Sequence, residues 1–102
     1  MITEIRRKVS DGKLEYSRHA VDQSITRNIG VDEIRGAMLN GEIIEGYPED
    51  KYGPSSLVFG RTLRGRPVHI HCSYPTRDFL KIITVYEPDS ESWEGFKIMK
   101  DV

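Results

Sequence analysis

Two of the three histidines of this chain, His69 and His71, lie two positions apart, and the single cysteine, Cys72, follows directly. Imidazole groups can bind a metal ion or transfer protons near neutral pH. Because side chains alternate across a β-strand, His69 and His71 would share one face of an extended segment, and Cys72 would lie on the other. The alternate apolar set is Val68, Ile70 and Cys72. We expect this set to face the core, with Cys72 as a small buried apolar side chain.

His69 and His71 supply at most half of a metal site. The remaining ligands would have to come from elsewhere, and His19 is the only other imidazole in the chain. A lone His-x-His pair lacks the ligand count and spacing that make zinc motifs specific. The sequence therefore favours no metal and no cofactor, while a metal-binding domain built on His19, His69 and His71 remains an open alternative.

A predicted helix over residues 16–30 carries a second set of polar side chains. At 100° per residue these side chains form one stripe along the helix. The stripe comprises His19, Gln23 and Arg27. Val21 and Ile25 lie roughly opposite and are expected to face the core, with Ser17 as the N-cap. The polar stripe either faces solvent or borders a groove beside His69, His71 and Tyr86.

The order of the predicted elements indicates an α+β domain. Helical spacing of apolar residues is followed, from Glu42 onward, by the period of two that is typical of strands. The predicted helices lie in segments 2–12, 16–30 and 31–42, and the predicted strands in segments 42–48, 56–63, 67–74 and 79–87. We expect a single domain over residues 1–102, with two to three N-terminal helices packed on one face of a mainly antiparallel sheet of about four strands. The other sheet face would stay open.

Three details of this arrangement can be tested against the structure. Segment 79–87 is the strand richest in β-branched residues, so we expect it to be central. In the last helix, Val31, Ile34, Met38 and Leu39 are expected to share the core face. After Pro88, the chain is expected to form either a last helical turn or a tail docked through Trp93 and Phe96.

Composition limits the classes of function. The chain has 102 residues, of which 37% are hydrophobic and 30% charged, as is typical of one compact domain. One cysteine and no apolar run long enough to span a bilayer predict a cytoplasmic protein without a membrane partner. A net charge of -1 excludes a global basic surface for nucleic acid. A core this small would also be stabilised by a second copy, so a homodimer is a further expectation.

Binding to RNA would therefore need a local basic patch. Two clusters of basic residues are candidates, one in the first helix and one around the predicted hairpin turn. They are Arg6, Arg7 and Lys8, and Arg61, Arg64 and Arg66. A solvated surface explains these clusters equally well.

Several short motifs resemble one protein family when they are taken in order. "SRHA" and "TRNIG" flank the second helix, "GRPVH" precedes the histidine strand, and "ITVYEPD" is followed by Trp93. Over about residues 14–97 this pattern resembles domain of unknown function 4258. That family in turn resembles the RelE/ParE-like toxin superfamily, small α+β domains encoded beside an antitoxin. Many of these toxins cleave messenger RNA without a metal.

The resemblance implies a metal-independent endoribonuclease toxin, with RNA and a cognate antitoxin as partners. Attack of a 2′-OH on the adjacent phosphorus needs a base, an acid for the leaving 5′-oxygen and a cation for the charged phosphorane. We expect His19 and His69 to supply the acid and base, with His71 in reserve. Arg27 would hold the phosphate, and Tyr86 would donate a proton or stack on a base. His19, His69 and Arg27 should then meet within about 10 Å on the open sheet face.

The alternative is a protein-binding module of the same fold. It would use the open sheet face or the segment with Trp93 and Phe96, and it predicts scattered histidines beside an exposed apolar patch. The superfamily includes toxins that act through a protein target, so the fold alone does not decide between these functions.

Overall fold

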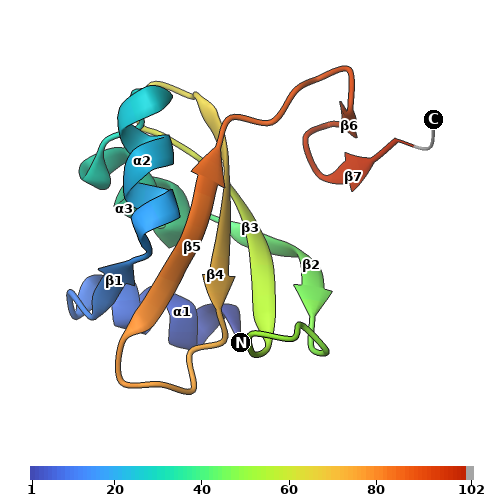
Figure 1. Cartoon of the computed structure of the whole chain (residues 1–102). Helices are drawn as coiled ribbons and strands as arrows, with labels where there is room; N and C mark the ends of the chain where they lie inside the picture. Colours follow the sequence, from blue (N-terminus) through green and yellow to red (C-terminus); the bar gives the residue numbers. More distant parts are fainter. Residues whose placement is uncertain (101–102) are drawn as a thin grey trace.

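In the computed structural model, which describes residues 1–100, three helices cover one face of a five-stranded sheet and a short hairpin follows (Figure 1). The helices are α1 (Ile2–Ser10), α2 (Arg18–Thr26) and α3 (Val31–Leu39). The sheet contains β1 (Leu14–Tyr16), β2 (Glu42–Tyr47), β3 (Ser55–Arg61), β4 (Pro67–Ser73) and β5 (Leu80–Tyr86). The hairpin contains β6 (Trp93–Glu94) and β7 (Ile98–Met99). The predicted α+β class, with helices first and a mainly antiparallel sheet after them, is confirmed.

The strand order of the main sheet is β1-β5-β4-β3-β2. Strands β2 to β5 pair antiparallel, and β1 pairs parallel to β5. Segment 79–87 forms β5, an interior strand between β1 and β4 as expected, while β4 takes the middle position. β1 was not predicted, since its three residues are too few to display a period. Its register pairs Leu14 with Leu80 and Tyr16 with Ile82.

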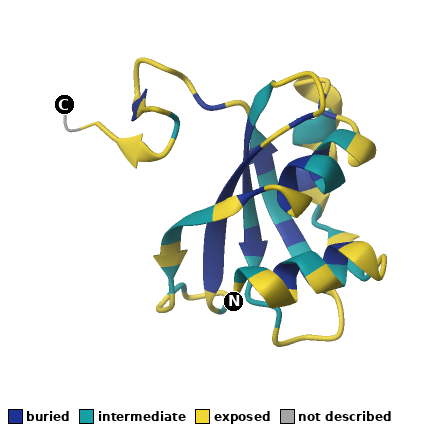
Figure 2. Ribbon diagram, turned by 180° about the vertical axis from the view of Figure 1, so that it is seen from behind, coloured by how far each residue is buried: buried dark blue, intermediate teal, exposed yellow. Residues whose placement is uncertain are grey.

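β4 separates an apolar face from a polar one, as its alternation predicts. Val68, Ile70 and Cys72 are fully buried and belong to the core that packs beneath the helices. Burial raises the pKa of the Cys72 thiol to about 12, so this cysteine is an inert core side chain. Figure 2 shows the buried stretches of the sheet behind the helix layer. His69 and His71 consequently project from the opposite face, which we call the front face.

The helix layer lies very close to β3 at Gly60. A Cβ placed on Gly60 would come within 1.8 Å of the carbonyl oxygen of Ala37 in α3. Beside this contact, Ile34, Ala37 and Met38 of α3 are fully buried. Only a residue without a side chain lets the two backbones approach so closely, which is why glycine is needed here.

The predicted core face of α2 was wrong. Val21 and Ile25 are 42% and 74% exposed, whereas Ala20 is buried. The rotation of α2 is set at its first turn: the Ser17 side chain caps the Ala20 N–H at 3.0 Å and donates to the carbonyl of Ile83 at 2.7 Å. These bonds fix the start of the helix on β5 and turn the small Ala20 side chain toward the sheet.

The prediction for α3 was wrong in part. Ile34 and Met38 are buried as expected, but Val31 and Leu39 are 52% and 43% exposed. Both exposed residues lie at the ends of the helix, where the sheet no longer covers them. Ala37, which was not part of the predicted stripe, is buried in their place.

β2 forms one edge of the sheet and is irregular. The pairing of β2 with β3 shifts between Ile43 and Glu45, which marks a bulge. The bulge alters the local alternation, so that Glu45 and Tyr47 both come to line the front face. The side chain of Glu42, also on this strand, pairs with Lys97 at 2.7 Å.

We predict that Gly60→Ala destabilises the fold by about 3 kcal/mol or more, because the added methyl group collides with the backbone of α3. Gly46→Ala is the matched control, since a Cβ on this β2 residue meets nothing within 4 Å. Urea unfolding of both variants measures the difference. Equal unfolding midpoints for the two variants would show that α3 can move away from β3 without cost.

Candidate functional site

The front face gathers polar and aromatic side chains from three neighbouring strands. His69 lies opposite Phe59 of β3 and Tyr86 of β5. His71 lies opposite Leu57 and Thr84 on the same two strands. Directly opposite residues on one sheet face are close enough to interact, so the register alone brings the histidines and Tyr86 together.

The C-terminal hairpin covers the part of the front face that holds His69. Trp93 lies edge-on to the His69 ring, with 4.5 Å between the ring centroids. His69 Nε2 lies 2.5 Å from the carbonyl oxygen of Phe96. The prediction of a docked tail is therefore confirmed over residues 87–100, whereas the last helical turn was wrong. Residues 101–102 lie outside the described part of the chain.

A tight turn shapes this hairpin. Gly95 and Phe96 have φ values of 58° and 63°, and the Lys97 N–H donates to the Glu94 carbonyl at 3.1 Å. Positive φ at both central residues is the pattern of a type I′ hairpin turn. Phe96 holds a conformation that a bulky residue rarely adopts, and in doing so presents its carbonyl oxygen to His69.

Both ring nitrogens of His69 are occupied, and the residue is fully buried. A carbonyl oxygen can only accept, so Nε2 carries a hydrogen and donates to Phe96. In the neutral ring, Nδ1 then accepts from the Tyr86 hydroxyl at 3.1 Å. Burial lowers the pKa of His69, in keeping with the neutral form. The front face is thus not open at His69, which corrects our expectation of an accessible acid or base there.

His71 belongs instead to a series of hydrogen-bonded polar side chains. Its Nε2 lies 2.8 Å from the Ser55 hydroxyl, which donates to the Asp50 carboxylate at 3.0 Å. Because the Ser55 proton is directed to Asp50, the Ser55 oxygen accepts from His71 Nε2–H. Nδ1 is then the basic nitrogen, and no partner for it is found within residues 1–100. Burial lowers the pKa of His71, and the negative charge of Asp50 opposes that shift.

Asp50 is well suited to hold this series of hydrogen-bonded side chains in place. The backbone N–H of Tyr52 and the Ser55 hydroxyl both donate to its carboxylate and lower the pKa of Asp50. Asp50 therefore stays ionised at neutral pH and orients the His71 ring through Ser55. Asp50 and Ser55 were not predicted from the sequence, because they lie in and just after a polar loop and show no recognisable spacing relative to His71.

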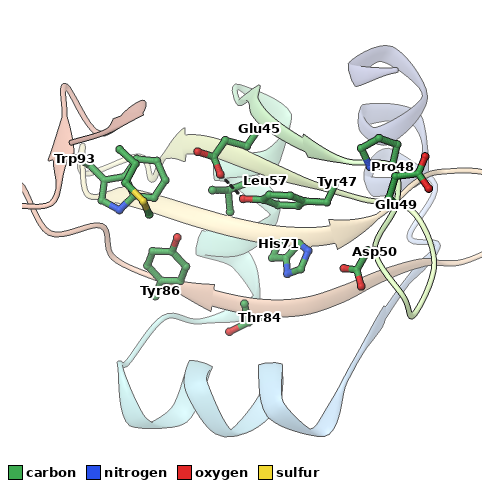
Figure 3. Close-up of a pocket in the computed structure, with 11 residues that line it drawn as sticks. Glu45, Tyr47, Pro48, Glu49, Asp50, Leu57, His71, Thr84, Tyr86 and Trp93 are labelled. Atoms are coloured by element: carbon green, nitrogen blue, oxygen red, sulfur yellow. Dashed lines mark hydrogen bonds between the residues drawn. The ribbon is translucent and has the colours of Figure 1, made fainter. Parts of the chain in front are cut away.

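Two cavities meet at His71. One, which we call the Trp93 cavity, has a volume of about 570 Å³ and is shown in Figure 3. The other, which we call the His19 cavity, has a volume of about 620 Å³ and lies toward the start of α2. His71 and Asp50 line both cavities.

The His19 cavity is lined by lysine and arginine and the Trp93 cavity is not. His19, Arg77 and Lys81 line the His19 cavity. None of the residues lining the Trp93 cavity is lysine or arginine. Arg77 and Lys81 were not singled out from the sequence, because isolated basic residues near a strand carry no signal of their own.

The predicted site residues therefore divide into two groups. His19 shares a cavity with His71, while His69 is enclosed by Trp93, Phe96 and Tyr86. Tyr86 lines the Trp93 cavity. His19 thus lines a cavity with His71, and His69 is not among the residues that line it.

Arg27 lies beyond the end of α2 and is exposed. Its Nε donates to Gln23 Oε1 at 2.5 Å. Burial raises the pKa of Tyr86, and the charge of Arg27 opposes that shift. Arg27 does not line the cavity that holds His19.

The first predicted RNA-binding cluster lies on the helix side of the sheet. Ile5 and Val9 anchor α1 in the core beneath the sheet, opposite the histidines. Arg6 donates to the Gly41 carbonyl at 2.7 Å, and Lys8 donates to the Asp78 carbonyl at 2.8 Å. Arg7 is exposed on the same helix. Arg6 and Lys8 tie α1 to its surroundings, and none of the three basic residues lines a front-face cavity.

The second predicted cluster is split. Arg66 is used internally: it donates to the carbonyls of Arg27 and Asn28 and pairs with Glu33 and Glu87. Arg61 is exposed and lies over the rings of Phe59 and Phe96, at 5.6 Å from each. Arg64 is exposed in the hairpin turn.

Within the described residues, the three histidines do not gather into the metal site considered as an alternative. Within residues 1–100, no three side chains of His, Cys, Asp or Glu lie close enough together to hold a metal ion. The proposed ligand set of His19, His69 and His71 is therefore corrected, because His69 directs both nitrogens to other partners.

Comparison with protein families matches residues 16–87 to a domain of unknown function, DUF4258. The chain belongs to the DUF4258 family. The DUF4258 match runs from the end of β1 to just past β5 and so includes most of the main sheet, α2 and α3. The helix α1 and the C-terminal hairpin lie outside it. Comparisons with curated proteins and with solved structures give no match. No helix in residues 1–100 is both long and apolar enough to cross a membrane.

We predict that the stability of this DUF4258 domain falls as the pH is lowered from about 7 to 5, partly because of His69. Its pKa in the folded state is below the ordinary 6.5, so the unfolded chain takes up the proton first and gains stability as the pH falls. His69→Gln keeps a donor for Phe96 but cannot titrate, so its stability should fall less over this interval. Urea unfolding at several pH values measures both slopes.

The exposed His19 provides the control for this experiment. His19→Gln should follow the wild-type slope, because His19 is not enclosed by the hairpin. If the His69→Gln and wild-type proteins lost stability in parallel, buried His69 would not be the group responsible.

Proposed function

We propose that this DUF4258 domain is a metal-independent endoribonuclease, the toxin of a type II toxin–antitoxin pair. The observation that carries the proposal is the His19 cavity, in which two imidazoles share one space with Lys81 and Arg77. These groups supply the base, the acid and the positive charge that metal-free RNA cleavage requires. The proposal also rests on the resemblance of the motif pattern to RelE/ParE-like toxins.

In the proposed reaction, His71 Nδ1 takes the proton of the 2′-OH. The 2′-oxygen then forms a bond to phosphorus while the bond from phosphorus to the 5′-oxygen breaks. Protonated His19 gives its proton to the leaving 5′-oxygen. The products are a 2′,3′-cyclic phosphate and a 5′-OH, with the proton moved from His19 to His71.

The environment of His71 suits the role of base. Burial holds the ring neutral near pH 7, so the basic nitrogen is available. Once the proton is taken up, the charge of Asp50, acting through Ser55, stabilises the imidazolium. Asp50 and Ser55 are therefore positioning residues, and His71 replaces His69 in the predicted pair.

The cation role passes from Arg27 to Lys81 and Arg77, which line the cavity that holds both histidines. Tyr52 and Tyr74 line the same cavity and offer ring faces on which unpaired bases can stack. The net charge of -1 means that only this local group of cations favours RNA. We expect modest affinity and strong dependence on salt.

A protein-binding module is the second candidate, and one observation favours it. Ile98 and Met99 of the C-terminal hairpin are 63% and 58% exposed. Met99 also lines the Trp93 cavity, so exposed apolar side chains continue into a concave surface. A cognate antitoxin could bind here in either function.

The test of the nuclease is cleavage of a fluorophore-labelled single-stranded RNA by the purified protein, with and without EDTA. We predict cleavage that persists in EDTA and leaves 2′,3′-cyclic phosphate ends. His71→Gln and His19→Gln should each reduce the rate by roughly 100-fold or more, the size expected for loss of a proton-transfer group. Uncleaved RNA with the wild-type protein, or cleavage abolished by EDTA, contradicts the proposal.

Asp50→Asn tests the positioning role separately. Without the charge of Asp50 the pKa of His71 falls further, so the acid limb of the pH–rate profile should move to lower pH. Lys97→Gln, an exposed lysine of the hairpin that does not line the His19 cavity, is the control and should retain the wild-type rate and profile. Urea unfolding verifies that each variant is folded.

A further inference from the structure

The Trp93 cavity has a different chemistry from the cavity of the proposed nuclease. Three aromatic rings line it, contributed by Tyr47, Tyr86 and Trp93 (Figure 3). They come from β2, β5 and β6, so this set exists only when the C-terminal hairpin lies on the sheet. Leu57 and Thr84 add apolar surface between the rings.

A carboxylate lies among these rings without a cationic partner. Glu45 is half-buried, and its side chain accepts a hydrogen bond from the Tyr47 hydroxyl. Within residues 1–100 no lysine, arginine or histidine forms an ion pair with Glu45, although five other ion pairs are present there. A half-buried charge without a counter-charge is costly, and a bound cation would relieve that cost.

Other negative groups in the cavity strengthen this preference. Glu49 and Asp50 line it together with Glu45, and none of its lining residues is lysine or arginine. The charge of Glu45 contributes to raising the pKa of both Tyr47 and Tyr86, although burial is the larger cause in each case. An anion such as a phosphate would be repelled from this cavity, whereas a cation would be attracted.

We propose that the Trp93 cavity binds an organic cation, a guanidinium or ammonium group on an apolar stem. The positive group would lie against the faces of Tyr47, Tyr86 and Trp93 and pair with Glu45, as cations do in aromatic cages. The stem would contact Leu57 and Thr84. A volume of about 570 Å³ is ample for such a group. An arginine side chain of a partner polypeptide and a free alkylguanidine share this chemistry.

The first experiment compares two probes that differ mainly in charge. n-Butylguanidinium and its neutral counterpart n-butylurea are titrated into the wild-type protein, and binding is followed by the fluorescence of Trp93, the only tryptophan of the chain. We expect saturable binding of n-butylguanidinium, at least about tenfold tighter than n-butylurea and weakened by salt. Equal binding of both probes, or no binding of either, overturns the proposal.

A variant tests the carboxylate. Glu45→Gln removes the charge but keeps an oxygen that can accept from Tyr47, and we expect it to weaken n-butylguanidinium binding by about tenfold. Glu15→Gln, an exposed carboxylate on β1 that does not line the cavity, is the matched control and should bind as the wild type does. Isothermal titration calorimetry repeats the measurement without relying on Trp93. Unchanged binding by Glu45→Gln overturns the proposed pairing.

A third probe distinguishes the two sources of the cation. Nα-acetyl-arginine N-methylamide has the flanking peptide groups of an arginine within a chain. Binding as tight as that of n-butylguanidinium identifies a side chain of a polypeptide as the fitting ligand, and much weaker binding identifies a free small molecule. None of these binding measurements requires nuclease activity. The proposed binding of an organic cation therefore stands or fails independently of RNA cleavage.

Discussion

The alternation of side chains along β4 is the constraint on which the rest of the structure depends. Val68, Ile70 and Cys72 are fully buried beneath the helices, so β4 has only one register that keeps them there. A shift by one residue would bring His69 and His71 into the apolar core. The close contact of Gly60 with Ala37 holds α3 against the neighbouring strand β3 and so helps to maintain this register of β4. The placement of His69 and His71 on the front face follows from this register.

Two histidines on one strand face share the same neutral form, with the hydrogen on Nε2, but differ in their surroundings. His69 is enclosed by the C-terminal hairpin and has both nitrogens engaged, while His71 is held through one nitrogen by Ser55. Burial lowers the pKa of both rings, although His69 is fully buried and His71 only partly. The two histidines differ in whether a ring nitrogen remains without a partner within residues 1–100. This depends on segments that are distant from β4 in the sequence.

Features that depend on local pattern were predictable from the sequence, and features that depend on tertiary contacts were not. The α+β order, the inward Cys72 and the Ser17 cap follow from periodicity and residue type. The rotation of α2 was predicted wrongly because Val21 and Ile25 form an apolar stripe as regular as that of the helix face that packs on the sheet. No period can reveal a three-residue strand such as β1.

The candidate site was predictable only in outline. The sequence places both histidines on one face, but not the covering of His69, because a short aromatic segment contains no signal of where it docks. The link from Asp50 through Ser55 to His71 joins a loop to a strand 21 residues away in sequence, and it exists only once the sheet has formed.

The two edges of the sheet also affect how the domain meets other polypeptides. A long regular edge can pair with an incoming strand and start aggregation. Here β2 is interrupted by its bulge and has the Glu42–Lys97 ion pair beside it, while the opposite edge strand, β1, has only three residues. The bulge, the ion pair and the short length of β1 each discourage backbone pairing with a second chain. The sheet therefore presents side chains on its front face and little unpaired regular backbone at its edges.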